Sequence, residues 1–377
     1  MYINFWYPIA KSTDVTTYQP FRTRVLSHYF VAFRDGDGKP HVLSDVCVHR
    51  GGALGKGWVR DGTVVCPYHG WQFDGSGHCT QIPTLADEKP PARAKVDSYP
   101  VQEKYGIVFA FLGDVAEPER PPLYHIEEYD QEGWRQNDLL IFELNAFYER
   151  SMENGIDPSH NEFVHPAQGS PALDPSRRKK PLDKKDGPWG STSVVRYAKK
   201  RASTEALGDA SPPRTDPTAS IGYYGPNVLM TWIHFGEDNM FHQYFFEAPI
   251  DDSHTRIFFV NLRTFMLEPE NDARVMKVNT LVAQEDIDLL ETLDPVRTPE
   301  STTEEVLLPT DGAVLSYRQY LRRWRDKGWR IDLKTLRAER GDKAFAIPCP
   351  GRHTSGNWVL SPVPLIAAGE QKKAAAE

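Results

Sequence analysis

The chain has 377 residues, of which 40% are hydrophobic and 11% aromatic, and its formal net charge is −8. This is the composition of a globular protein, and the length allows two domains with separate cores. The negative charge argues against a nucleic-acid partner, because the phosphates would meet no broad basic surface. No apolar run approaches the roughly 18 residues expected of a membrane-spanning helix, and the N-terminal residues lack the features of a secretory signal. We therefore expect a soluble cytoplasmic protein that has no membrane partner.

The N-terminal region, residues 1–115, is predicted to be a small antiparallel β domain. Short apolar runs at 29–34 and 107–112 are each followed by turn residues. This alternation is typical of strands joined by tight turns. A segment rich in proline and glutamate, 117–122, comes next, and we expect the domain boundary there.

Two short segments of this region pair a cysteine with a histidine: Cys47 with His49, and Cys66 with His69. Two thiolates and two imidazoles delivered by two short loops suit a [2Fe–2S] cluster in which two histidines replace two cysteines on one iron. Glycines follow each pair, where the backbone would have to turn tightly around the sulfur atoms. The pattern therefore predicts an iron–sulfur site.

A Cys₂His₂ zinc site and four unrelated core residues are the alternatives to an iron–sulfur cluster. Zinc sites more often keep like ligands together, whereas here each loop carries one cysteine and one histidine. The segments CVHRGG and CPYHGWQFDGSG closely resemble the signature of the Rieske family. The remaining cysteines, Cys79 and Cys349, are expected to be buried free thiols.

Beyond residue 115 a helical pattern is followed by three strand patterns in series and a second helical pattern, which predicts an α+β domain of residues 116–367 and a disordered tail at 368–377. The expected helices are 142–154, ending at the C-cap Gly155, and about 272–293. We expect them to pack on one antiparallel sheet. The expected strands are Val228–Phe235, Met240–Glu247 and Arg256–Leu262.

His160 and His165, five positions apart, form a second candidate metal site. A facial triad of two histidines and one carboxylate holds Fe(II) from one side and leaves positions open for O₂ and substrate. On a regular helix, five residues leave two side chains about 140° apart, so both can reach one iron only if the helix is broken. Pro166 follows at once and fits such a break. Alternatively, Asp157 caps a helix that begins with Pro158, and both histidines are ordinary helix residues.

This segment resembles the N-x-x-D-x-x-H-x₄-H pattern of the Rieske non-haem iron oxygenases, with matches at Asn154, Asp157, His160 and His165. The resemblance implies that the two histidines bind a mononuclear iron and that Asn154 and Asp157 belong to the catalytic machinery. It also implies that Asp157 bridges subunits, contacting the cluster ligand His69 of one subunit and His160 of its own. We favour this bridging role over the capping role.

The carboxylate of the triad is expected on the predicted helix 272–293. The acidic candidates are Glu285, Asp286, Asp288, Glu291 and Asp294. Asp286 shares a stripe with valine and leucine residues, whereas Asp288 lies on a polar face. A carboxylate inside an apolar stripe is costly unless a partner such as Fe(II) offsets it, and segment 284–287 resembles the acidic motif of the same family. Asp286 is the predicted ligand, with Asp294 in reserve.

Together these matches resemble the terminal oxygenase component of a Rieske system. The resemblance implies a Rieske β domain followed by a helix-grip catalytic domain with an antiparallel sheet, a [2Fe–2S] cluster, a mononuclear Fe(II) and a ring that is commonly a homotrimer. No G-x-G-x-x-G motif opens a helix after a strand, so a separate NAD(P)H-dependent reductase, with or without a ferredoxin, is expected to supply electrons. The basic run 177–185 would suit an acidic ferredoxin, although such runs are more often solvated loops.

A weaker resemblance lies near the C-terminus. Segments 308–311 and 316–324 resemble the corresponding stretch of the pheophorbide a oxygenase group. The C-x₂-C pair of that group is absent, so its substrate is not carried over. An amphipathic helix that covers the core explains the segment equally well.

The expected reaction is hydroxylation of an uncharged aromatic or alicyclic small molecule with O₂ and external electrons. Oxidative O- or N-demethylation and ring cis-dihydroxylation use the same metal parts and are alternatives, as is a Rieske electron carrier, which would need only residues 1–115. The expected strands supply eight large apolar residues, about half of which should face the helices and form an apolar cavity, with Trp232 in its wall. These residues are Met230, Trp232, Phe235, Phe241, Phe245, Phe246, Phe258 and Phe259.

Overall fold

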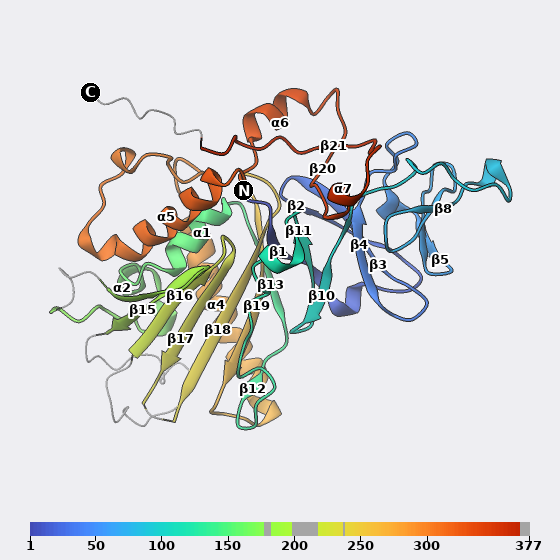
Figure 1. The fold of residues 1–377 in the computed structure, drawn as a ribbon. Coiled ribbons are helices and arrows are strands. Elements are labelled where there is room, and N and C mark those ends of the chain that lie inside the picture. Colours follow the sequence, from blue (N-terminus) through green and yellow to red (C-terminus); the bar gives the residue numbers. More distant parts are fainter. Residues whose placement is uncertain (177–181, 198–217, 237, 370–377) are drawn as a thin grey trace. The chain divides into compact units, whose positions relative to one another are not determined.

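The computed structural model describes residues 1–176, 182–197, 218–236 and 238–369, which form two compact units (Figure 1). The first unit combines residues 1–123 with the C-terminal residues from Arg323 onward, and the second unit is Tyr124–Arg322. This division differs from the expected domains, because residues 323–367 were expected in the second domain and belong to the first unit. Residues 370–377 of the predicted disordered tail lie outside the described residues. In the described part of the chain, no helix is both long and apolar enough to cross a bilayer.

Antiparallel sheets dominate the first unit, in agreement with the predicted β domain. The first sheet has the order β1 (Phe5–Lys11), β11 (Ile107–Leu112) and β10 (Val101–Lys104). The second has the order β2 (Phe21–Val25), β3 (His28–Arg34), β4 (Pro40–Ser44) and β9 (Ser98–Tyr99). The third has the order β5 (Trp58–Arg60), β6 (Thr63–Val65), β7 (Gln72–Phe73) and β8 (Cys79–Gln81). Every residue of β11 is buried, so this strand lies at the centre of the core.

The C-terminal residues join the first unit through a buried ion pair. They form α6 (Leu333–Glu339), α7 (Gly351–Thr354) and a short parallel pair of strands, β20 (Phe345–Ala346) and β21 (Ser361–Pro362). Arg352 donates to the fully buried carboxylate of Asp97 from Nε at 2.6 Å and from Nη2 at 2.7 Å. Because a buried carboxylate without a partner is strongly unfavourable, this bidentate contact attaches the segment to the N-terminal sheets. A contact across 255 positions leaves no local trace in the sequence, which explains why the expected domains did not group this segment with the N-terminal residues.

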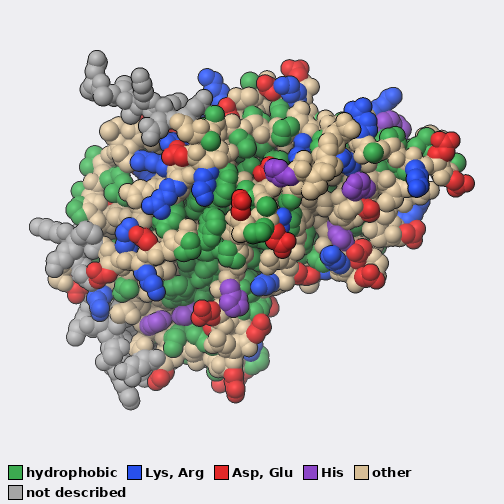
Figure 2. All heavy atoms as spheres, in the orientation of Figure 1, with side chains coloured by type: hydrophobic (Ala, Val, Ile, Leu, Met, Phe, Trp, Pro, Cys, Tyr) green, Lys and Arg blue, Asp and Glu red, His purple; other side chains and the backbone are tan. Residues whose placement is uncertain are grey.

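One eight-stranded antiparallel sheet forms the centre of the second unit, in the order β12-β19-β18-β17-β16-β15-β14, with β13 also paired to β19. Its strands are β12 (Arg135–Gln136), β13 (Leu140–Leu144), β14 (Asp183–Asp186), β15 (Gly190–Arg196), β16 (Thr218–Tyr224), β17 (Val228–His234), β18 (Met240–Pro249) and β19 (Thr255–Arg263). The last three closely match the predicted strands. In Figure 2, hydrophobic side chains gather over the middle of this sheet.

The other face of the sheet carries helices α1 (Tyr148–Gly155), α2 (Asn161–Val164) and α4 (Asp272–Leu290) (Figure 1). Helix α4 agrees with the predicted long helix. The prediction of a helix from residue 142 was wrong, because Phe142 and Leu144 belong to β13 and α1 begins only at Tyr148. Leu144 pairs with Thr255 of β19 and packs against Ile257 and Leu290, so pairing with a distant strand outweighs the local helical pattern.

The amphipathic helix α5 (Gly312–Asp326) covers α1 through a buried ion pair. Arg318 donates to both carboxylate oxygens of Glu153, from Nε at 2.6 Å and from Nη2 at 2.7 Å. The Tyr317 hydroxyl donates to the carbonyl of Pro226 at 2.7 Å. Segment 316–324 is therefore part of an amphipathic helix that packs on the core, which is one of the two interpretations of its sequence.

Candidate metal centres

The two cysteine–histidine loops of the first unit have the same backbone hydrogen bonds. In one loop, the amide of Gly51 donates to the carbonyl of Cys47 at 2.9 Å. In the other, the amide of Gly70 donates to the carbonyl of Cys66, also at 2.9 Å. Gly51 and Gly70 have φ angles of 72° and 71°, which a glycine adopts without strain. The matching turns explain why each pair is followed by glycine.

Each loop buries its cysteine and exposes its histidine. Cys47 and Cys66 are buried, whereas the rings of His49 and His69 are exposed and lie 4.4 Å apart between centroids. His49 also stacks on Trp71 at 4.6 Å. Two sulfur donors at the base and two imidazoles at the tip fit a cluster with one buried and one outer iron.

The surroundings of the sulfur atoms favour a thiolate at Cys66. A hydrogen bond from the Cys47 thiol, supported by the backbone amides of Tyr68 and His69, lowers the pKa of Cys66 to about 6. The same hydrogen bond raises the pKa of Cys47. A Cβ atom on Gly52 would lie 3.1 Å from the sulfur of Cys66, so glycine leaves the room that a cluster needs. Both remaining cysteines, Cys79 and Cys349, are buried free thiols, as expected.

The structure brings His160, His165 and Asp286 together in the second unit. The two histidine Nε2 atoms lie 3.1 Å apart. Oδ1 of Asp286 lies 3.6 Å from Nε2 of His160 and 3.3 Å from Nε2 of His165. Adjacent ligands about 2.1 Å from an ion at right angles would lie about 3 Å apart. The donor set and this triangle therefore fit a two-histidine, one-carboxylate metal site.

Neighbouring groups fix the orientation of all three side chains. Nδ1 of His160 faces the backbone carbonyl of Asp157, and Nδ1 of His165 lies 3.0 Å from Oε2 of Glu285. Each imidazole therefore turns its Nε2 lone pair toward the site. Asn154 donates from Nδ2 to Oδ1 of Asp286 at 2.8 Å. Burial lowers the pKa of His160, which favours the neutral form that binds metal ions.

The helix is broken between the two histidines, as their spacing requires. Helix α2 has only four residues, His160 immediately precedes it, and His165 follows it with φ −110° and ψ 67°. Asp157 does not cap this helix, because the N-cap position is occupied by His160. Oδ1 of Asp157 instead accepts from the amide of Ser159 at 2.8 Å.

Three of the other acidic candidates lie apart from the triad. Asp288 is exposed and accepts from Gln284 at 2.7 Å, and Glu291 accepts from the amide of Asn145 at 2.8 Å. Asp294 is exposed beyond the end of α4. Glu285 orients His165, a role that the sequence analysis missed, although its position next to Asp286 pointed to the site.

A cavity of about 170 Å³ opens on the triad, between the sheet and helices α1 and α4. Phe235, Phe241, Phe245 and Phe259 line it, which is half of the eight residues expected. The prediction for Trp232 was wrong. Trp232 donates from Nε1 to the hydroxyl of Tyr244 at 2.7 Å and is absent from the cavity wall, because alternate residues of β17 face opposite sides of the sheet.

Two buried amides in the cavity wall, Gln243 and Asn279, also escaped the sequence analysis. Asn279 lies seven positions before Asp286 on α4, so the helical period that selects Asp286 also selects Asn279. Gln243 lies on β18 between Phe241 and Phe245, and the strand period could have found it.

Comparison with known proteins gives two family matches. Residues 5–100 match the Rieske [2Fe–2S] domain, and residues 144–327 match the vanillate O-demethylase oxygenase C-terminal domain. The chain is 26% identical over 336 residues to methylxanthine N1-demethylase NdmA of Pseudomonas putida, which covers 85% of this chain and 88% of that protein. It is 32% identical over 164 residues to the oxygenase subunit of 3-chlorobenzoate-3,4-dioxygenase of Comamonas testosteroni, covering 43% of this chain and 37% of that protein.

Solved structures agree on the fold. Dicamba monooxygenase bound to dicamba superposes with a TM-score of 0.71 at 21% identity, covering 85% of this chain and 96% of that chain. The two family matches lie on the two parts of the chain that contain the paired loops and the triad. The chain therefore belongs to the Rieske oxygenases, oxidoreductases whose cofactors are a [2Fe–2S] cluster and a mononuclear iron.

Proposed function

We propose that this chain is the terminal oxygenase of an electron-transfer system and that it hydroxylates one carbon of an uncharged aromatic or alicyclic molecule. The observation that carries the proposal is the apolar cavity that ends at His160, His165 and Asp286. Among the described residues of its wall, none is lysine or arginine, so a substrate carboxylate would find no lysine or arginine to pair with. The reaction consumes one O₂, two electrons and two protons, and it gives the alcohol and one water.

The ligand assignments follow from the donor sets. Cys47 and Cys66 would hold one iron of the cluster and His49 and His69 the other, while His160, His165 and Asp286 would hold the mononuclear iron. The cluster supplies single electrons, and the mononuclear iron supplies the site at which O₂ is reduced.

The remaining groups of the chain hold this geometry and exclude water. Glu285 fixes the ring of His165, and Asn154 fixes the carboxylate of Asp286. The phenylalanine side chains and the aliphatic residues Ile287 and Leu290 surround a bound molecule with hydrocarbon. A cavity of this size compares with the roughly 150 Å³ of an apolar cavity that binds benzene, so we infer a substrate of one or two rings.

Oxidative demethylation is the second candidate. It is favoured by the match to the vanillate O-demethylase C-terminal domain and by the relative NdmA, a methylxanthine N1-demethylase that spans most of both chains. Hydroxylation of a methyl carbon on oxygen or nitrogen gives a product that releases formaldehyde, so the same geometry serves both reactions. Ring cis-dihydroxylation is less favoured, because the dioxygenase relative matches less than half of this chain.

The partners are proposed by family resemblance. A separate NAD(P)H-dependent reductase, with or without a ferredoxin, supplies the electrons, and the chain forms a homotrimer in which Asp157 bridges subunits. The start of the basic run, residues 177–181, lies outside the described residues, so its role in docking a ferredoxin stays a prediction.

Iron content and substrate-dependent O₂ uptake test the proposal together. The wild-type protein is expected to contain three irons per chain, two in the cluster and one in the triad. Asp286→Ala should keep the cluster spectrum but lose one iron and all substrate-dependent O₂ uptake. The matched control is Asp288→Ala, an exposed carboxylate on the same helix, which should keep all three irons. Two irons per chain in the wild type would point to an electron carrier instead.

A further inference from the structure

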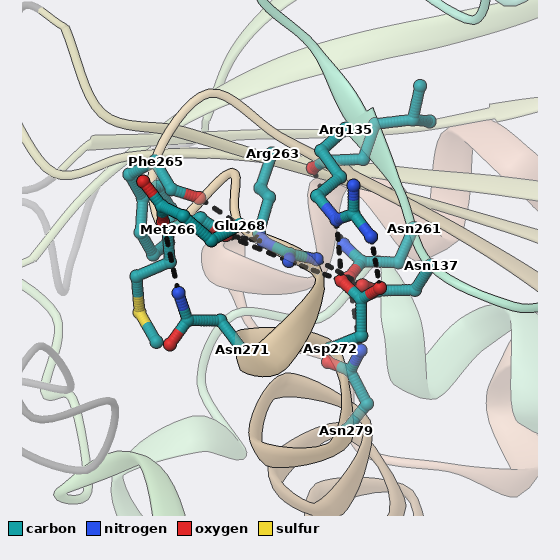
Figure 3. A network of polar contacts seen from close by, with 11 residues as sticks. Arg135, Asn137, Asn261, Arg263, Phe265, Met266, Glu268, Asn271, Asp272 and Asn279 are labelled. Atoms are coloured by element: carbon teal, nitrogen blue, oxygen red, sulfur yellow. Dashed lines mark hydrogen bonds and ion pairs between the residues drawn. The ribbon is translucent and has the colours of Figure 1, made fainter.

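A chain of polar groups runs from an ion pair to Asn279 (Figure 3), and Asn279 lines the cavity. It begins at Arg263, whose side chain is fully buried. The guanidinium donates to Oδ1 of Asp272 at 2.6 Å, and Nε donates to the carbonyls of Phe265 at 3.1 Å and Met266 at 3.0 Å. An arginine side chain can only donate hydrogen bonds, so it imposes a direction on every group that follows.

This direction passes through two asparagines. Arg263 donates from Nη1 to Oδ1 of Asn137, so Asn137 must turn its NH₂ group away, and it donates to Oδ1 of Asn261 at 2.5 Å. The orientation of Asn261 has a second anchor, because its Nδ2 donates to the backbone carbonyl of His242 at 2.9 Å. A backbone carbonyl can only accept, so neither amide can be flipped without losing a hydrogen bond.

The last two amides extend the same direction into the cavity wall. Asn279 donates from Nδ2 to Oδ1 of Asn261 at 3.1 Å, and its own Oδ1 accepts from Nε2 of Gln243 at 3.5 Å. The remaining acceptor of the chain is Oε1 of Gln243, which has no partner among the residues that the structure describes. Gln243 lines the cavity, so its carbonyl oxygen is the acceptor of this chain that is left for a bound molecule.

We propose that Gln243 selects substrates that present a neutral hydrogen-bond donor, such as a phenol O–H or a ring N–H, on the side away from the reacting carbon. This inference rests on the proposed function, since it concerns the substrate of the same cavity. Gln243 contacts Asn279, and Asn279 lies seven residues before Asp286 on α4, which corresponds to about 10 Å along the helix axis. The donor and the carbon that reacts therefore lie at opposite ends of the substrate.

The magnitude follows from the burial of Gln243, which is 8% exposed. A neutral hydrogen bond in such a site contributes about 1.4 kcal/mol, or about tenfold in affinity. An ammonium donor would gain less, because one carbonyl oxygen cannot replace its hydration and no acidic side chain other than Asp286 lines the cavity within the described residues.

Matched pairs of small molecules test the proposal in the metal-loaded protein. Phenol and toluene differ by O–H against CH₃, and indole and indene differ by N–H against CH₂. Their dissociation constants are measured by calorimetry without reductant, so that no turnover occurs. Gln243→Leu is expected to lower the preference for the donor over its isostere about tenfold in both pairs. Gln243→Met, whose unbranched side chain is longer than that of leucine, provides a second variant. Thermal melting and the visible spectrum report whether each variant is folded.

The control is Thr231→Val, which removes a polar group from the cavity wall at the position paired with Gln243 on the neighbouring strand. It should leave both preferences unchanged. An unchanged preference in both Gln243 variants, an equal loss in Thr231→Val, or no saturable binding of phenol and indole at millimolar concentration would each overturn the proposal. Because binding is measured without turnover, an inactive protein that shows the expected preference would contradict the proposed function alone.

Discussion

Removal of the Glu285 carboxylate should weaken iron binding at the triad while leaving the Rieske cluster intact. Oε2 of Glu285 lies 3.0 Å from Nδ1 of His165, and Oε1 accepts from the amide of Ala167 at 2.9 Å. One carboxylate thus holds both the ring of His165 and the backbone just beyond it. Loss of such a supporting group costs about 10- to 100-fold in metal affinity, which corresponds to about 1.4–2.7 kcal/mol. We expect a loss in this range for Glu285→Ala.

The assay is a titration of the iron-depleted triad with Fe(II) under anaerobic conditions, with the cluster spectrum as an internal control. Glu285→Gln keeps one acceptor oxygen and can satisfy only one of the two donors, so its loss should be smaller. Asp288→Ala, three positions along the same helix and exposed, should bind iron as the wild type does. An unchanged affinity in Glu285→Ala would show that the orientation of His165 does not depend on Glu285 and would refute the reasoning.

Three further predictions concern separate parts of the second unit. Burial raises the pKa of the fully buried Glu247 to about 8 from its ordinary value of 4.5. Between these two pH values the carboxyl is ionised in the unfolded chain but protonated in the folded chain, so the free energy of unfolding falls as the pH rises from about 4.5 to about 8. In urea unfolding, the difference in free energy of unfolding between Glu247→Gln and the wild type should therefore change by about 2 kcal/mol in favour of the variant as the pH rises from about 6 to about 8. A difference that does not depend on pH would contradict this. Asp157→Asn can still accept from Ser159, so metals and melting temperature should persist while turnover falls, and full turnover would argue against the bridging role. Trp232→Ala should leave the substrate preference unchanged and Phe245→Ala should alter it, as competition between substrates would measure; the reverse would place the cavity on the other face of the sheet.

The parts of the molecule that could be predicted from the sequence depend on patterns of residues within one short segment. Strands β17, β18 and β19 were found from their apolar runs, and the five-residue spacing of His160 and His165 predicted a broken helix. Asp286 was selected by the helical period and lies beside both histidines. That these three side chains bind iron stays a prediction, which the iron content of Asp286→Ala would test.

The parts that could not be predicted depend on contacts between distant positions. Phe142 fits a helical pattern locally, but it pairs with Ile257 of β19. The face on which Trp232 lies is set by the register of the sheet, which the aromatic composition of the strand does not reveal. The amide chain from Arg263 to Gln243 is assembled from three strands or strand ends and one helix, so no single segment carries its signal.

Helix α4 carries the proposed metal ligand Asp286 and, seven positions earlier, Asn279, the amide that contacts Gln243. Asn279 and Asp286 share the rigid backbone of α4, so their separation cannot change without deforming the helix. The distance between the Asn279 end of the cavity and the metal ligand is therefore fixed, and along one face of this helix it changes only in steps of one turn, about 5.4 Å. Val282 and Ala283 line the cavity one turn nearer to Asp286. An amide introduced at either position would shorten this span by that step and redirect oxidation toward a carbon closer to the donor.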